Sequence, residues 1–135
     1  MRTAGAVGLL ALAAALVGCG SAPPDLFLVQ RSGADRNANV TVVVNDGGSV
    51  SCNGKSHPLP ADQLLRARQL LRDLQTQAQL HLALPPGPRS ELSYRARMEA
   101  GNVSFSDTSR GNPKSFLQLA AFTKDVTEDV CGLNR

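Results

Sequence analysis

The clearest local signal in this chain of 135 residues is the stretch Asn39-Val40-Thr41-Val42-Val43-Val44-Asn45-Asp46-Gly47-Gly48-Ser49-Val50-Ser51-Cys52-Asn53. Its β-branched residues fit the half-buried surface of a pleated strand. The Asp-Gly-Gly turn in its middle supplies the positive backbone angles that tight hairpins need. The stretch therefore predicts a β-hairpin with strands at 39–45 and 49–53.

The segment before the hairpin predicts a further strand at 25–31. Leu26 and Leu28 fall on one side of an extended chain, and Phe27 and Val29 fall on the other. The sequence Ser32-Gly33-Ala34-Asp35 ends the strand, because small and turn-forming residues interrupt the alternation.

The segment after the hairpin has the period of an amphipathic helix, from Pro58-Leu59-Pro60-Ala61-Asp62 to about residue 80. Its apolar stripe consists of Leu64, Ala67, Leu71, Leu74 and Ala78, widened by Leu65 and Leu70. A stripe of this kind packs on a core, lies on a membrane or binds a partner. The absence of aromatic residues in the stripe and the mixed charge of the opposite face favour the core.

The last third of the chain predicts two more strands and a second helix. Pro85-Pro86-Gly87-Pro88 breaks the chain, and apolar and polar residues then alternate over 92–99 and 102–107. Asn112-Pro113 begins a helix that ends near residue 126. Together these segments predict an α+β domain, in which two helices pack on one face of an antiparallel sheet of four to five strands.

The N-terminus resembles a bacterial lipoprotein signal. Residues 4–17 are almost entirely Ala, Leu, Val and Gly, and Leu16-Val17-Gly18-Cys19 matches a lipobox. This resemblance implies a signal peptide at 1–18, a lipidated Cys19, a short tether at 19–24 and one domain at 25–135. The product would be anchored in the cell membrane or envelope by acyl chains such as palmitate and would face outside the cytoplasm. An ordinary signal peptide is the alternative.

With Cys19 assigned to the lipid, Cys52 and Cys131 remain as an even pair in an exported chain. A disulfide between them is the natural inference in an oxidising compartment. It would close a loop of about 79 residues, for which chain entropy gives at most roughly 4 to 5 kcal/mol of stabilisation. The alternatives are two free thiols or half of a metal site.

Charge restricts the classes of partner. Once Arg2 leaves with the signal, thirteen Lys and Arg residues face eleven Asp and Glu residues, and few aromatic residues are available for stacking. These values disfavour nucleic-acid binding. The strand residues Arg95 and Arg97, and the loop from Arg31 to Arg36, form the candidate binding surface for an acidic partner. The alternative is a solvated face that keeps the sheet soluble.

The sequence contains no catalytic or metal-binding motif. Neither His57 nor His81 has a nucleophile or a carboxylate at motif spacing. The acidic residues Asp107, Asp125, Glu128 and Asp129 do not match the spacing of a calcium loop. We therefore expect no enzyme, no metal and no cofactor.

Four segments resemble the emfourin-type small protease inhibitors: Val29-Gln30-Arg31-Ser32-Gly33, Leu59-Pro60-Ala61-Asp62-Gln63-Leu64, Pro85-Pro86-Gly87 and Leu92-Ser93-Tyr94-Arg95-Ala96. That family comprises small β/α proteins that inhibit thermolysin-like metalloproteases. The resemblance covers most of residues 26–126 and assigns no inhibitory residue. This chain departs from the family pattern in three features: the lipid anchor, the cysteine pair and Ala34-Asp35.

The sequence thus predicts an exported, lipid-anchored, non-enzymatic domain that binds a protein partner, with protease inhibition as the most concrete form. The alternative is an envelope lipoprotein that binds a small ligand or a polyanion. In either case we expect a monomer that contacts the membrane through its anchor.

Overall fold

A computed structural model describes residues 20–135, which form one antiparallel sheet of six strands with two helices. The strand order across the sheet is β4-β3-β2-β1-β5-β6. The strands are β1 (Asp25–Gly33), β2 (Val40–Asn45), β3 (Ser49–Cys52), β4 (Lys55–Pro58), β5 (Leu92–Met98) and β6 (Gly101–Ser106). The α+β class is confirmed, and the sheet has six strands rather than the expected four to five.

The additional strand is β4 at one edge of the sheet. A turn at Asn53 and Gly54, whose φ angles are 51° and 83°, returns the chain onto β3. The strand has only four residues and is largely exposed, so its sequence shows no alternation of apolar and polar residues. Short, polar edge strands of this kind resist pairing with other chains and carry little sequence signal.

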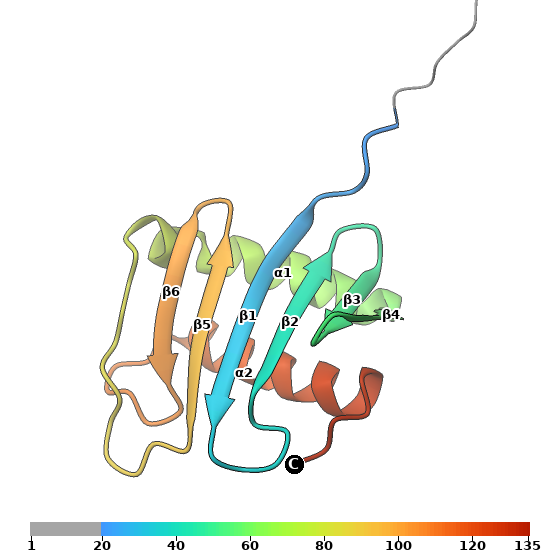
Figure 1. The fold of residues 1–135 in the computed structure, drawn as a ribbon. Helices are drawn as coiled ribbons and strands as arrows, with labels where there is room; N and C mark the ends of the chain where they lie inside the picture. Colours follow the sequence, from blue (N-terminus) through green and yellow to red (C-terminus); the bar gives the residue numbers. More distant parts are fainter. Residues whose placement is uncertain (1–19) are drawn as a thin grey trace, which may run out of the picture.

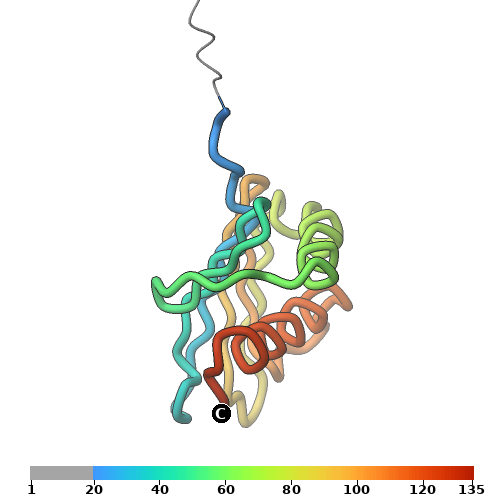
Figure 2. The backbone as a smooth tube through the Cα atoms, turned by 90° about the vertical axis from the view of Figure 1, so that its right-hand side faces the viewer, coloured from blue at the N-terminus to red at the C-terminus, as the bar shows by residue number. Residues whose placement is uncertain are grey.

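The two helices cover one face of the sheet and leave the other uncovered (Figures 1 and 2). The first helix, α1, spans Ala61–Gln79, and the second, α2, spans Lys114–Asp125. A π-helical turn, η1 (Val126–Val130), continues α2. Both predicted helices are therefore present, on the same side of the sheet.

The core lies between the helices and the covered face of the sheet. Phe27 of β1 meets Phe122 of α2 edge to face, with ring centroids 5.8 Å apart. Phe105 of β6 stacks between Tyr94 and Phe116, with centroid distances of 4.9 and 4.6 Å. These contacts join the sheet to α2 and fix which residues of each strand point away from the core.

The apolar stripe of α1 is narrower than the sequence predicts. Ala67, Leu70, Leu74 and Ala78 are buried, whereas Leu65 is 63% exposed. Leu65 precedes Leu74 by nine positions, which places it about 180° around the helix. The expectation that Leu65 widens the core stripe is therefore wrong.

The Cys52–Cys131 disulfide is present. It joins β3 to the residue that follows η1, across a sequence separation of 79 residues. The sulfur–sulfur distance is 2.02 Å and the Cα atoms lie 6.3 Å apart. The bridge thereby fastens the C-terminal segment to the side of the sheet that carries the helices.

The predicted membrane attachment rests on N-terminal residues outside the described range. The expected signal peptide at 1–18 and the lipidated Cys19 both lie there. Within residues 20–135, neither helix combines the length and the hydropathy needed to cross a bilayer.

Candidate binding surface

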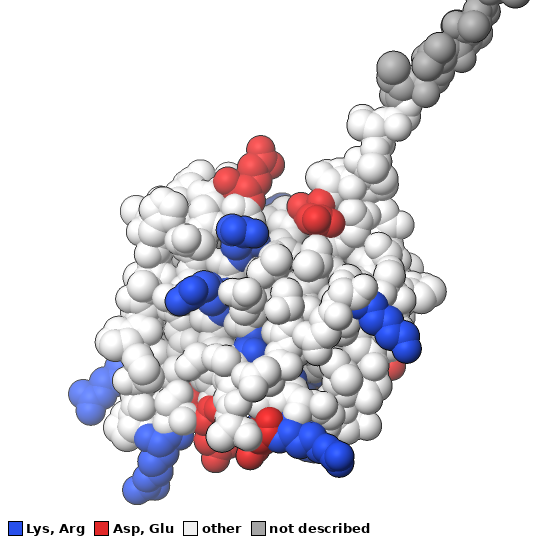
Figure 3. All heavy atoms as spheres, in the orientation of Figure 1, with Lys and Arg blue, Asp and Glu red and all other residues white. Residues whose placement is uncertain are grey.

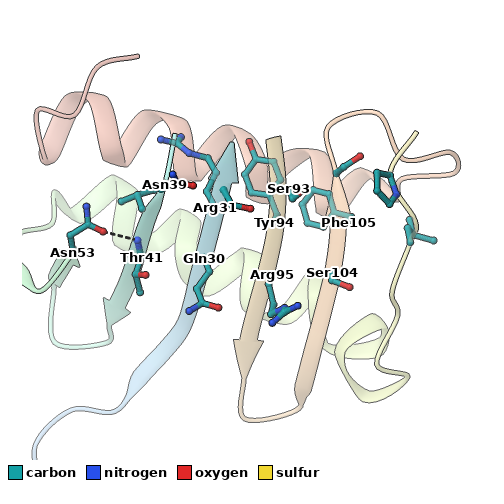
Figure 4. A pocket seen from close by; sticks show the side chains of 15 residues that line it. Gln30, Arg31, Asn39, Thr41, Asn53, Ser93, Tyr94, Arg95, Ser104 and Phe105 are labelled. Atoms are coloured by element: carbon teal, nitrogen blue, oxygen red, sulfur yellow. Dashed lines mark hydrogen bonds between the residues drawn. The ribbon is translucent and has the colours of Figure 1, made fainter. Parts of the chain in front are cut away.

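The uncovered face of the sheet carries a row of polar side chains across four strands. The strand register pairs Gln30 of β1 with Thr41 of β2 on one side and with Arg95 of β5 on the other. Arg95 in turn pairs with Ser104 of β6. We call Thr41, Gln30, Arg95 and Ser104 the polar row; in Figure 4 they lie side by side across the sheet.

The polar row lies within a hollow of about 600 Å³. Leu84 and Pro86, from the loop between α1 and β5, line one side of the hollow, and Asn53 lines it from the turn after β3. The backbone of Leu84 donates a hydrogen bond to the carbonyl of Ser104, at 2.8 Å. The loop is thus fixed along the outer edge of β6, where it forms one wall of the hollow.

The hollow is positive and contains no acidic residue. Its only charged lining residues among those described are Arg31 and Arg95. Arg97, two residues beyond Arg95, is also exposed on this face, and neither Arg95 nor Arg97 forms an ion pair within residues 20–135. Figure 3 shows basic atoms in the middle of this face and acidic atoms toward its upper and lower ends.

Arg31 does not belong to this surface, although the sequence placed it there. Its side chain is 2% exposed and lies on the helix side of the sheet, in phase with Phe27 and Val29. Its Nε donates to the carbonyl of Ala38 at 3.0 Å, and one terminal nitrogen donates to the carbonyl of Asn37 at 2.9 Å. Only its backbone region can reach the hollow.

Burial also changes the titration of this region. Desolvation lowers the pKa of Arg31, an effect partly opposed by neighbouring Tyr94. Desolvation likewise raises the pKa of Tyr94. The two side chains therefore behave as interior groups, with the guanidinium stabilised by backbone carbonyls instead of a carboxylate.

The four candidate arginines thus occupy three places. Arg95 and Arg97 share the open face, and Arg31 is interior. Arg36 is exposed in the loop between β1 and β2, at the end of the sheet. The candidate surface therefore reduces to Arg95, Arg97 and the uncharged residues around them.

The two histidines lie at opposite edges of the sheet. His57 is in β4, one edge strand, and the Nδ1 atom of His81 lies 2.9 Å from the Oδ1 atom of Asn102 in β6, the other edge strand. The side chain of His81 thus contacts an amide of the edge strand β6. The structure therefore does not bring the histidines into a shared site.

Two of the four acidic residues considered for calcium, Asp107 and Asp125, have other partners. Asp125 forms an ion pair with Arg66 at 2.6 Å. Asp107 accepts hydrogen bonds from the backbone of Glu91 and Leu92, at 3.1 and 3.2 Å. Within residues 20–135 no three His, Cys, Asp or Glu side chains gather in a way that could hold a metal ion.

The residues of the predicted tether are hydrogen-bonded to the domain from Pro23 onward. Asn45 donates through its Nδ2 atom to the carbonyl of Pro23 at 2.8 Å, and the backbone N–H of Asp46 donates to the carbonyl of Pro24 at 2.9 Å. A Cβ atom at Gly47 would come within 2.9 Å of the Pro23 ring and 2.8 Å of the Asn45 Oδ1 atom, so a larger residue here would displace one of these side chains. The predicted tether is therefore held to the β2–β3 turn from Pro23 onward.

No match to this chain was found among protein-family models, curated proteins or solved structures.

Proposed function

We propose that this chain is an exported, lipid-anchored domain that binds a protein partner through the open face of its sheet. The observation that carries the proposal is the contrast between a helix-covered face and an uncovered face, which contains a hollow and two arginines that form no ion pair within residues 20–135. A sheet face that packs on no other element is available to a partner. Its central cations favour a partner of opposite charge.

The N-terminal signal and the disulfide support export. Arg2 and the apolar residues 4–17 resemble a secretory signal, and the lipobox Leu16-Val17-Gly18-Cys19 would provide the thiol for lipidation. The Cys52–Cys131 bridge is compatible with an oxidising compartment outside the cytoplasm. The two features agree, although they lie in different parts of the chain.

The attachment of Pro23 and Pro24 to the β2–β3 turn supports a fixed presentation of the domain. Only residues 20–22 separate Cys19 from the first hydrogen-bonded residue, a reach of about 10 Å. The β2–β3 turn and the start of β1 would then face the bilayer; in Figure 1 residues 20–24 leave the domain at this end of the sheet. The open face would stand beside the membrane, where a partner can reach it.

Protease inhibition is the most concrete form of this function, because of the resemblance to the emfourin-type inhibitors. An assay of the disulfide-bonded domain against thermolysin-like metalloproteases tests it. Stoichiometric inhibition supports this form. If the protease keeps its full activity at a large molar excess of the domain, protease inhibition is excluded. The proposal then remains for protein partners other than these proteases.

The alternative, a small-ligand or polyanion binder, draws on the same hollow. It predicts binding to an anionic polymer that weakens steeply as salt is added, because exposed charges are screened over about 10 Å at 0.1 M salt. A protein partner seated over the whole face also buries uncharged residues. Its affinity therefore depends less on salt.

The test of the proposed function blocks the open face with a bulky residue. Full-length protein is purified from detergent-solubilised membranes in the Gln30→Trp and Thr76→Trp forms; Gln30 is exposed on the open face, and Thr76 is exposed on α1. We expect a co-purified protein in near-stoichiometric amount with wild type and Thr76→Trp, and its loss with Gln30→Trp. Recovery of the partner in equal amounts with both variants contradicts the proposal. An intact mass of the protein that shows no acyl chains on the N-terminus also contradicts it.

A further inference from the structure

We propose that the polar row binds an extended acidic segment of the partner, which crosses the strands with a carboxylate on Arg95. This inference rests on the proposed function and specifies the chemistry of the partner. The polar row has one guanidinium, one amide and two hydroxyl groups, and it lies in the hollow that the structure forms over β1, β5 and β6 (Figure 4).

The size of the polar row fits a short extended peptide. Neighbouring strands lie about 4.8 Å apart, so the four residues span on the order of 14 Å. An extended chain advances about 3.3 Å per residue, so about four or five residues would cover this span. The donors and acceptors of the row are spaced across the strands, where they can meet the backbone groups and side chains of such a segment.

The walls of the hollow are fixed before any ligand binds. Ser104 donates its backbone N–H to the carbonyl of Leu82 at 3.0 Å and accepts from the N–H of Leu84. On the opposite side, the Oδ1 atom of Asn53 accepts a hydrogen bond from the N–H of Thr41 at 2.9 Å. A preformed groove reduces the conformational entropy that binding would cost.

The charge of the hollow selects a carboxylate. The cross-strand neighbours of Arg95 are Gln30 and Ser104, and those of Arg97 are Leu28 and Asn102, all of them uncharged. The guanidinium of Arg95 is therefore free to donate two parallel hydrogen bonds to a carboxylate, the geometry that arginine favours.

The same features favour a peptide over a uniformly charged polymer. A polyanion gains most of its affinity from many cations along its path. The hollow offers one free guanidinium, with Arg97 as a neighbour on the same face, and its remaining groups are hydroxyls and amides. Those groups match peptide backbone amides, which also need hydrogen-bond partners when they are covered.

The test measures binding of three probes to the full-length protein in detergent, with the disulfide intact. The first probe is a labelled decapeptide of alternating Glu and Ser, the second has Gln in place of Glu, and the third is polyphosphate. We expect the Glu peptide to bind at least tenfold more tightly than the Gln peptide. We expect Arg95→Ala to weaken Glu-peptide binding about tenfold, because the substitution removes a hydrogen bond between charged groups whose strength is reduced by exposure to solvent.

Arg72→Ala is the matched control, because Arg72 is an exposed arginine on α1 and should leave the affinity unchanged. The inference is overturned if the Glu and Gln peptides bind with equal affinity, or if Arg95→Ala and Arg72→Ala reduce the affinity equally. It is also overturned if neither peptide binds, or if polyphosphate alone binds. If Gln30→Trp still abolishes partner recovery in any of these cases, only the acidic-segment inference fails. If Gln30→Trp has no effect on recovery, the proposed function itself fails.

Discussion

The two faces of the sheet use the same strands and differ most clearly at two arginines. Arg31 of β1 points to the helix side and is 2% exposed, whereas Arg95 of β5 is exposed on the open side. Arg31 donates to two backbone carbonyls of the loop that follows β1, and its third contact is the hydroxyl of Thr127, at 3.4 Å. Arg95 has neither an ion pair nor a side-chain hydrogen bond within residues 20–135.

This difference shows how position decides what an arginine does. Where neighbouring loops supply carbonyls, a guanidinium can be buried without a carboxylate and can tie distant segments together, here β1, the loop at 37–38 and η1. Where the cross-strand neighbours are uncharged and the face is open, the same group remains available for a ligand. We therefore expect substitutions on the covered face to change the free energy of unfolding, and substitutions on the open face to change binding of the partner.

The largest expected effect is loss of the disulfide that fastens the C-terminal segment to the covered side. Replacing Cys52 and Cys131 together by Ser should lower the free energy of unfolding by up to about 4 kcal/mol, because the unfolded chain regains the entropy of a long loop. Urea denaturation of the anchored protein measures the change. A loss below about 1 kcal/mol would mean that packing alone holds this segment.

The next effect compares the two arginines directly. Arg31→Met should cost about 3 kcal/mol, since it leaves the buried carbonyl of Ala38 and the part-buried carbonyl of Asn37 without their donors. Arg95→Met, an identical change on the open face, should alter the free energy of unfolding by less than about 0.5 kcal/mol. Denaturation curves of the two variants give this comparison, and equal losses would show that the faces do not differ as described.

A smaller effect follows from Tyr94, the only tyrosine in the chain. Desolvation raises its pKa in the folded state, so folding favours the protonated phenol. The resulting stability is fully present below the unfolded pKa near 10 and is lost as pH rises through the folded pKa. We expect the free energy of unfolding to fall above about pH 10 more steeply in wild type than in Tyr94→Phe, and parallel curves would contradict this account.

The smallest effect concerns the tether, which belongs to neither face. Asn45→Ala removes the hydrogen bond to the carbonyl of Pro23 and should cost about 1 kcal/mol or less. Its clearer consequence is faster amide exchange at Asp46, whose N–H donates to Pro24. Unchanged exchange at Asp46 would show that Asn45 is not what holds the tether to the β2–β3 turn.

The residues that could be predicted are those whose signal is local. The β2–β3 hairpin follows from β-branched residues around Asp46-Gly47-Gly48, and β5 and β6 follow from alternation. The disulfide followed from counting thiols in an exported chain. In contrast, β4 is too short and polar to show a period, and its existence depends on the turn at Asn53 and Gly54.

The errors at the candidate site have a physical cause. Arg31 is in phase with Phe27 and Val29, so the alternation of β1 already indicated an inward position, but the carbonyls that make this position tolerable come from a loop whose path is tertiary. The attachment of Pro23 to Asn45 likewise joins residues 22 positions apart. Such contacts depend on the assembled fold and have no local pattern in the sequence.

The most direct test of the account places a photo-crosslinking residue on each side of the molecule in the anchored, full-length protein in its native membrane. One variant carries it at Gln30, beside Arg95 on the open face, and the other at Thr76, exposed on α1. We predict one discrete protein adduct from position 30 and none from position 76. Adducts of equal yield from both positions, or an adduct from position 76 alone, would contradict the claim that the open face is the binding surface.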